Sequence, residues 1–227
     1  MNKVPVLLFA AGKGTRMGAL TANQPKPMVR VAGRPLIDHA LDLTKRPDLQ
    51  TPVINTHYCA NVLHDYLAGQ DVIFSDEADL LRETGGGLRF ALPHLQGSPV
   101  ITLNTDAVWR GDNPLAVLLS HWTNDMEALL LTVPRDNALG HSGNGDFIRN
   151  TDQRLTRGPG EVYTGAQMIR TDNLSQITKD VFSMNEFWDL IAQRDGLFGA
   201  SYHGKWCDVG RPDSIPIAEA MLRGHDV

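Results

Sequence analysis

The sequence predicts an α/β fold in which helices flank a mixed, mainly parallel β-sheet, with a small β-hairpin insertion. Short apolar segments alternate with segments of helical spacing over residues 1–133, the pattern of a parallel sheet covered by helices. The first apolar segment runs into a glycine-rich loop, as expected at the carboxyl end of a buried strand. After Pro134 this alternation gives way to a hairpin pattern. We expect one domain spanning residues 1–227.

Each element follows from local spacing. Strands are expected where short apolar runs are bounded by turn residues, at Val4–Phe9, Pro52–Thr56, Val72–Ser75, Pro99–Leu103, Glu127–Val133, Val162–Ile169 and Leu197–Tyr202. Helices are expected where apolar residues recur at helical spacing, at Pro35–Leu43, Ala60–Leu67, Gly85–Leu92, Leu115–Trp122, Asn185–Gln193 and Asp213–Leu222. Thr84 is expected to cap the third helix, and Asn113 with Pro114 the fourth. Gly145–Gly158 is expected to form the hairpin, turning at Asn150–Gln153.

Charge and composition exclude several classes of partner. The chain has a net charge of −5, and its tryptophans are not interleaved with basic residues, so we expect no nucleic-acid binding. No apolar run approaches the roughly 18 residues of a bilayer span, and Val4–Ala11 is too short for a secretory leader, so no membrane partner is expected. Two cysteines do not make a disulfide framework, which favours a cytoplasmic location. The sequence predicts no oligomeric state.

A cationic pole nevertheless opens the chain. Residues 1–37 hold six Lys and Arg and no Asp or Glu, which indicates an anionic ligand at this place. Within the loop Ala10–Met17, small residues allow a flat base to approach, and Gly12 and Gly14 allow N–H groups to face phosphate. Lys13 and Arg16 add positive charge. Neither a Walker loop nor a complete GxGxxG is present, and the loop alone also fits a glycine-rich turn with solvated cations.

Lys26 lies between two prolines, which restrict the backbone on both sides and aim one ammonium group.

Leu8–Met17 followed by Pro25–Pro27 resembles the opening signature of the sugar-nucleotidyltransferase family, with Phe9 in place of a leucine. The resemblance implies the Rossmann-like nucleotide-diphospho-sugar transferase fold, in which residues 1–133 bind mainly the nucleotide and residues 134–227 mainly the sugar. Enzymes of the family join a nucleoside triphosphate to a sugar 1-phosphate and release pyrophosphate.

Glu83-Thr84-Gly85-Gly86-Gly87 is a second motif. Glycines at a helix start can leave N–H groups free for a close ligand, although the same spacing also fits a flexible loop. Within the family this segment most resembles the bacterial N-acetylmuramate-1-phosphate uridylyltransferases of cell-wall recycling. The resemblance implies that the nucleotide is bound by Ala10, Ala11, Gly12, Lys13, Gly14, Thr15, Arg16, Glu83, Thr84, Gly85 and Asn104.

Two carboxylates are candidates for a Mg²⁺ site. Asp106 follows an apolar strand and so lies at the carboxyl edge of the sheet, where a carboxylate can hold Mg²⁺. Its neighbours Thr105 and Ala107 depart from the family's Gly-Asp pattern. Trp206-Cys207-Asp208-Val209-Gly210 resembles the late Trp-x-Asp-x-Gly motif of the family, which implies that Asp208 joins Asp106 on the metal. The resemblance makes Arg16, Lys26, Asp106 and Asp208 the catalytic residues.

The sugar side is predicted from two segments. Gly145-Asp146-Phe147 resembles a Gly-Asp-Phe segment of the uridylyltransferases, and Tyr163-Thr164-Gly165 resembles their Ser/Thr-Gly strand. We therefore expect Asp146, Glu161, Thr164 and Gly165 to bind the sugar, while a hairpin entry and a core strand remain alternatives from spacing alone.

Other functions remain open from the sequence. UTP with N-acetylmuramate 1-phosphate is the favoured pair, and mannose 1-phosphate with GTP or choline phosphate with CTP are the alternatives. A non-catalytic nucleotide-sensing subunit is a further alternative, against which Lys26, Asp106 and Asp208 argue.

Overall fold

The computed structural model describes residues 3–224 and is organised around one large β-sheet. Its strands are β1 (Val6–Phe9), β4 (Val53–Thr56), β5 (Ile73–Asp76), β6 (Val100–Asn104), β8 (Ala128–Val133), β12 (Val162–Ile169) and β13 (Leu197–Ser201). These seven strands lie in the order β13-β8-β12-β6-β1-β4-β5. The expected strands are therefore confirmed.

The sheet is mixed and mainly parallel, as predicted. Strands β4 and β6 both run parallel to β1, β5 runs parallel to β4, and β13 runs parallel to β8. Only β12 is antiparallel to its neighbours β6 and β8 among the strands of this sheet in residues 3–224. The amino end of β12 therefore lies at the same sheet edge as the carboxyl ends of the other strands, which is where open α/β sheets bind ligands.

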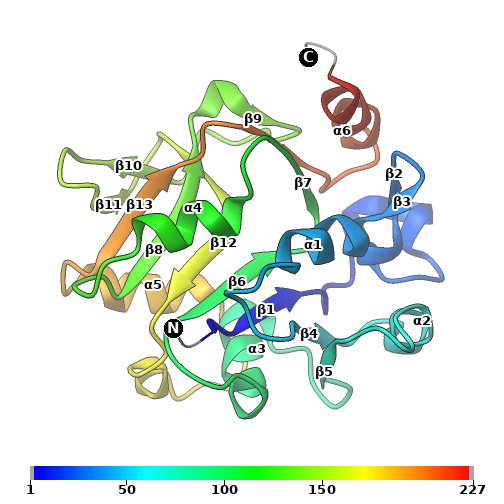
Figure 1. Ribbon diagram of the computed structural model, residues 1–227, viewed down its shortest axis with the longest axis horizontal. Coiled ribbons are helices and arrows are strands. Elements are labelled where there is room, and N and C mark those ends of the chain that lie inside the picture. The colour runs from blue at the N-terminus through cyan, green and yellow to red at the C-terminus, as the bar shows by residue number, and fades with distance from the viewer. Residues whose placement is uncertain (1–2, 225–227) are drawn as a thin grey trace.

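Six helices within residues 3–224 pack on this sheet or on the smaller strands beside it. They are α1 (Leu36–Thr44), α2 (Ala60–Tyr66), α3 (Glu83–Ala91), α4 (Pro114–His121), α5 (Met184–Ala192) and α6 (Ser214–Arg223). Successive strand residues face opposite sides, so Leu8 packs with α1 and α4 while Leu7 packs with α3 and α5. Figure 1 shows these two helix pairs on the two faces of the sheet. Short 3-10 helices occupy Thr15–Thr21, Lys26–Met28, Leu92–His94, Arg135–Asn137 and Leu174–Gln176.

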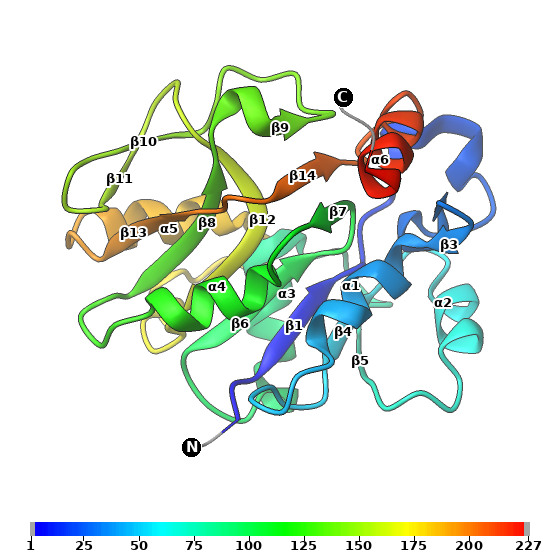
Figure 2. The same cartoon turned by 45° about the horizontal axis from the view of Figure 1, so that its top comes forward.

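Smaller sheets surround this core. The predicted hairpin is confirmed as the antiparallel pair β10 (Phe147–Arg149) and β11 (Leu155–Arg157). An unpredicted sheet places β14 (Lys205–Asp208) between β7 (Ala107–Arg110) and β9 (Ala138–Leu139), with β7 and β14 side by side in Figure 2. Strands β2 (Arg30–Val31) and β3 (Arg34–Pro35) form a short pair. No helix in residues 3–224 has both the length and the apolar character needed to cross a membrane.

The helix starts give one confirmation and one correction. The Asn113 side chain accepts hydrogen bonds from the N–H groups of Leu115 and Ala116 at 2.9 and 3.3 Å, so it caps α4 as predicted. Thr84 does not cap α3, because the helix already begins at Glu83. Its hydroxyl instead accepts from the N–H of Met184 at 2.9 Å, which joins the starts of α3 and α5.

Candidate active site

Two carboxylates from distant parts of the chain meet at the ligand-binding edge of the sheet. Asp106 lies between the end of β6 and the start of β7, and Asp208 ends β14. Strands β7 and β14 pair so that Ala107 lies opposite Asp208, and the N–H of Val209 donates to the Asp106 carbonyl at 2.8 Å. The unpredicted second sheet thus brings together the two residues expected to hold a metal.

Two of the predicted cations join these carboxylates. The Lys26 ammonium group donates to Asp106 Oδ2 at 2.7 Å, and Lys26 is only 9% exposed. Arg16 and Asp208 meet beside Gly210: a Cβ there would lie 2.9 Å from Asp208 Oδ2 and 3.3 Å from the Arg16 guanidinium. A side chain at Gly210 would therefore push these charged groups apart. All four residues expected to be catalytic lie at one place.

Burial disfavours the ionised form of one carboxylate in this cluster. Burial is the largest cause that raises the pKa of the Asp208 carboxyl, and the charge of Asp106 raises it further. Lys26, Arg16 and His141 act on the Asp208 pKa in the opposite direction. Because the pKa of Asp208 remains raised, the site favours the arrival of another positive charge or a proton.

The chemistry of this pair fits a divalent cation. Carboxylate oxygens are the hard ligands that Mg²⁺ prefers, and a bound cation would stabilise the ionised form of Asp208, whose pKa is raised chiefly by burial. Residues 3–224 contain no cluster of three or more His, Cys, Asp or Glu side chains suited to a metal. The other ligands of a cation held by Asp106 and Asp208 would therefore be phosphate oxygens and water, the usual surroundings of Mg²⁺ at phosphoryl-transfer sites.

A cavity of about 410 Å³ opens from this cluster. Its first lining segment is Ala10–Gly12, after β1, and its second comprises Leu81, Glu83 and Thr84, at the start of α3. Lys26, Asn104 and Asp106 also line the cavity. The cavity therefore joins small backbone segments, suited to a flat base, to the charged groups suited to phosphates.

The loop after β1 leaves its cations exposed. Gly14 has a φ of 62°, and a Cβ there would lie 2.9 Å from the Lys26 Cβ, so glycine is required at this position. Lys13, Thr15 and Arg16 are exposed, and within the described chain neither Lys13 nor Arg16 forms an ion pair. Lys13 and Arg16 are therefore free to meet an anionic ligand.

The glycine run of α3 has a different use from the one predicted. The N–H groups of Gly85 and Gly86 both donate to the Phe182 carbonyl, at 3.0 and 3.1 Å, so they are not free for a ligand. A Cβ on Gly85 would overlap the Phe182 ring at 2.4 Å, and one on Gly86 would overlap the Asp180 carbonyl at 2.3 Å. These glycines permit close packing of the segment before α5, and Glu83 and Thr84 line the cavity.

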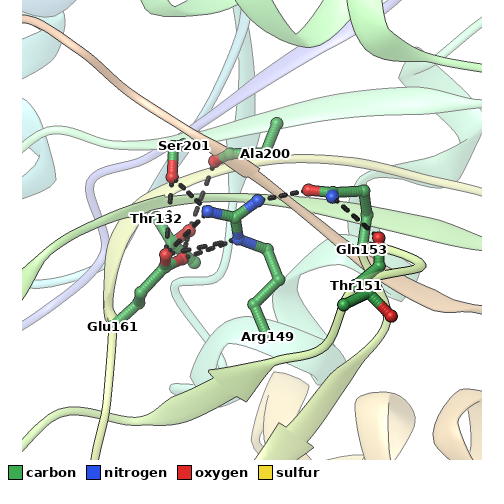
Figure 3. Close-up of polar contacts among 7 residues, drawn as sticks. All are labelled: Thr132, Arg149, Thr151, Gln153, Glu161, Ala200 and Ser201. Atoms are coloured by element: carbon green, nitrogen blue, oxygen red, sulfur yellow. Dashed lines mark hydrogen bonds and ion pairs between the residues drawn. The ribbon is translucent and has the colours of Figure 1, made fainter.

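Glu161, expected to bind the sugar, has its carboxylate oxygens occupied (Figure 3). Arg149 donates to both oxygens, with its Nη2 2.9 Å from Glu161 Oε1, and Thr132 and Ser201 also donate to this carboxylate. Arg149 additionally donates to Gln153 in the hairpin turn. Glu161 therefore anchors the hairpin to the sheet edge through its contacts with Arg149 and Ser201.

The remaining sugar-side residues are placed differently from one another. Asp146 lines a second cavity and accepts a hydrogen bond from the N–H of Tyr163 at 2.8 Å. The Thr164 hydroxyl is buried and donates to the Leu131 carbonyl at 2.7 Å, so it is not available to a sugar. Gly165 has a φ of 84°, and a Cβ there would lie 2.8 Å from the Asn104 side chain. Gly165 thus makes room for Asn104 at the first cavity.

Replacing Arg149 by Met is expected to destabilise the protein by roughly 2 kcal/mol at pH 7, because the half-buried Glu161 carboxylate loses its charged partner. Burial alone would raise the pKa of Glu161, but the hydrogen bonds of Arg149 and Thr132 and the charge of Arg149 outweigh it and lower the pKa. The stabilisation is present above the ordinary value of 4.5 and is lost as pH falls through the lowered folded-state value. Urea unfolding of both proteins across this range measures the difference.

Arg194→Met is the matched control, because Arg194 pairs with Glu127 at 2.8 Å but is more exposed, at 34%. We expect a loss of less than about 1 kcal/mol there. An Arg149→Met loss that stays constant from pH 7 to pH 3 would contradict the assigned role of Glu161 ionisation.

Two residues near the site escaped sequence reasoning. Asn55, which lines the first cavity, and Glu77 are both buried, with exposed fractions of 3% and 0%. Asn55 lies in an apolar strand and Glu77 directly follows one, so both were visible as polar residues at the carboxyl edge. Their partners were not visible, because those partners lie far away in the sequence.

Comparisons with known proteins identify the family. The MobA-like NTP transferase domain matches residues 6–159. N-acetylmuramate alpha-1-phosphate uridylyltransferase of Caulobacter vibrioides is 31% identical over 98% of this chain and 99% of the relative, and that of Neisseria meningitidis is 28% identical over 95% and 96%. A putative glucose-1-phosphate thymidylyltransferase of Bacillus anthracis has the same fold, with a TM-score of 0.79 at 17% identity over 99% and 97% of the chains. The chain therefore belongs to the MobA-like NTP transferase family, among its sugar-1-phosphate nucleotidyltransferases.

Proposed function

We propose that the protein transfers uridine monophosphate from UTP to N-acetylmuramate 1-phosphate and releases pyrophosphate, with Mg²⁺ as cofactor. The observation that carries this proposal is the meeting of Lys26, Arg16, Asp106 and Asp208 beside a cavity that Lys26 and Asp106 line together with small backbone segments. The choice of substrates is supported by the relatives of that name, which are similar to this chain over nearly its whole length. The predicted cytoplasmic location remains a prediction.

The reaction needs no nucleophile from the protein. A phosphate oxygen of the sugar 1-phosphate, already an anion at neutral pH, forms a bond to the α-phosphorus of UTP. The bond from that phosphorus to the bridging oxygen breaks, and pyrophosphate leaves with the electron pair. Catalysis then consists of holding two anions in line and neutralising the charge that builds up between them.

Each part of the site has a proposed role in this step. Ala10–Gly12 and Glu83–Thr84 hold the base and ribose, together with Asn104. Lys13, Thr15, Arg16 and the amides around Gly14 bind the triphosphate. Lys26 orients the reacting phosphates, which it reaches by leaving its ion pair with Asp106. Asp106 and Asp208 would hold Mg²⁺, which supplies charge neutralisation at the phosphate oxygens when bound.

The sugar is proposed to lie at the adjoining sheet edge. The Tyr163 amide donates to Asp146 Oδ2, so the second carboxylate oxygen of Asp146 is proposed to bind a sugar hydroxyl group. Glu161 would act through Arg149 and Ser201, and Gly165 through the space that it leaves beside Asn104.

A pyrophosphate-release screen tests the substrate assignment. Four nucleoside triphosphates are paired with N-acetylmuramate 1-phosphate, other sugar 1-phosphates and choline phosphate at saturating Mg²⁺. We expect UTP with N-acetylmuramate 1-phosphate to have the highest kcat/KM, by at least about tenfold over the next pair. A preference for GTP with mannose 1-phosphate, or for CTP with choline phosphate, would reassign the substrates. Nucleotide binding without turnover of any pair would instead indicate a sensing subunit.

A further inference from the structure

At the wall of the nucleotide cavity lies a buried amide–carboxylate pair that the proposed chemistry does not use, and its amide residue, Asn55, is among the residues that line the cavity. Asn55 is in β4 and Glu77 directly follows β5, the neighbouring strand of the sheet. Their side chains are joined by a hydrogen bond of 2.8 Å from Asn55 Nδ2 to Glu77 Oε1. Burial raises the pKa of Glu77, although its hydrogen bonds oppose that shift. A carboxylate in this environment persists only where its hydrogen bonds compensate it.

The pair connects the two segments that line the cavity. On one side, Asn55 Oδ1 accepts from the N–H groups of Ala10 and Ala11, at 2.7 and 3.3 Å. On the other side, Glu77 Oε2 accepts from the N–H of Arg82 at 3.0 Å. A continuous series of hydrogen bonds therefore runs from the first lining segment, through two side chains, to Arg82, which lies between the lining residues Leu81 and Glu83.

The backbone of the second lining segment is strained, so it needs a hydrogen bond that holds it in place. Glu83 has a φ of 57°, in the left-handed region that non-glycine residues rarely adopt. Glu77 holds the preceding residue, Arg82, at its amide. Gly87 packs directly on the pair, since a Cβ there would lie 2.8 Å from Glu77 Oε1 and 2.9 Å from Asn55 Nδ2. The glycine of α3 closest to the pair thus leaves room for it, and no side chain can be added without displacing it.

The donors and acceptors at the two ends determine the direction of each hydrogen bond between Ala10 and Arg82. The backbone N–H groups at both ends need acceptors, so Asn55 must present its oxygen to Ala10 and its NH₂ group to Glu77. Glu77 must then accept on both oxygens. With an amide at position 55 and a carboxylate at position 77, every donor in this series has an acceptor. A carboxylate at position 55 and an amide at position 77 would pair the same groups equally well.

We propose that Asn55 and Glu77 are positioning residues that hold the two main-chain segments of the cavity at a fixed spacing, and that base selectivity among nucleoside triphosphates depends on this pair. The inference rests on the proposed function in so far as the cavity binds the base of a nucleotide. The pair touches no reacting atom. It acts on the planar base through the Ala10–Ala11 and Arg82–Glu83 backbones, so its loss weakens nucleotide binding and leaves the sugar phosphate site intact.

Single and paired exchanges test this inference. In Asn55→Asp two carboxylates face each other, and in Glu77→Gln one NH₂ group must face another N–H donor whichever way the amides turn. The double variant Asn55→Asp/Glu77→Gln restores all donors and acceptors and keeps one negative charge. We expect each single variant to raise the Kd for UTP roughly tenfold, the size of one or two lost hydrogen bonds, and the double variant to recover most of it.

The measurements separate positioning from simple stability. UTP affinity is measured by calorimetry without sugar phosphate. Pyrophosphate release gives the ratio of kcat/KM between UTP and the next best triphosphate. Circular dichroism gives Tm. The single variants should narrow the ratio about tenfold and leave the KM for sugar 1-phosphate unchanged. Gln167→Met is the matched control, because Gln167 bridges Thr102 and Trp188 in a buried network of the same sheet. It should lower Tm while UTP affinity stays as in the wild type.

The outcomes are distinct. Single variants that lose Tm but keep UTP affinity and the base ratio would overturn the inference. If both single variants fail to fold, a folded double variant that binds UTP like the wild type supports it, and one that has lost UTP binding overturns it. A wild-type protein that prefers another triphosphate reassigns the substrate, and the same variants are then compared with that triphosphate. A wild-type protein that binds none of the four overturns both proposals.

Discussion

Asp106→Asn and Asp208→Asn are each expected to lower kcat at least about 10²–10³-fold, while the protein remains folded. Asparagine preserves the size of each side chain but removes the charge that would hold Mg²⁺ at the phosphates. Asp208 ends β14 and Asp106 lies just before the paired strand β7, so the two carboxylates act together and neither is expected to replace the other. Pyrophosphate release at saturating Mg²⁺ measures kcat, and circular dichroism checks the fold.

The same two variants should differ in stability. Burial and the charge of Asp106 raise the pKa of Asp208, which means that the folded protein is destabilised by an ionised carboxylate there. Asp208→Asn should therefore keep or raise Tm. Asp106→Asn leaves the buried Lys26 without its partner at 2.7 Å and should lower Tm. Asp152→Asn, in the exposed hairpin turn, is the control and should change neither quantity. Near-wild-type rates in both site variants would refute the metal assignment.

Lys26→Met is expected to lower kcat about 10²–10³-fold, the size of one electrostatic contact made in a transition state. Methionine fills the same buried space, so the loss is mainly of charge. The Mg²⁺ concentration that supports half-maximal activity should not rise, because Lys26 no longer competes with a cation for Asp106 Oδ2. Kinetics at varied Mg²⁺ and UTP separate these two effects.

The matched control for this variant is Lys45→Met. Lys45 also lies 2.7 Å from a carboxylate, that of Asp42, but its side chain is 75% exposed and it lines a separate cavity. It should retain wild-type kcat. A Lys26→Met enzyme with unchanged kcat but a raised Mg²⁺ requirement would show that Lys26 organises the metal site and does not act on the phosphates.

Much of the fold could be predicted because its patterns are local. An apolar run such as Pro99–Leu103 is recognisable by itself, and so is the cap at Asn113. The start of α3 was misjudged for the opposite reason. Thr84 has the composition of a cap, but its hydroxyl is engaged by the amide of Met184 on another helix. Tertiary contact there overrides the local preference.

The site residues show the same division. Asp106 was expected at the sheet edge because it follows a parallel strand. The contacts of Glu161 and Thr164 could not be predicted, because Arg149, Ser201 and Leu131 reach them from separate elements. A hydrogen-bond donor has no sequence signature when its acceptor is brought near only by folding.

The sequence by itself determined the alternation of strands and helices, the cationic loop at the start and the order of the motifs, since each depends on residues close together in the chain. The tertiary structure alone decided that Lys26 pairs with Asp106, that β7 and β14 bring Asp106 to Asp208, and that Asn55 and Glu77 join the two lining segments. These partners are chosen by burial, which forces polar groups to find one another once water is excluded.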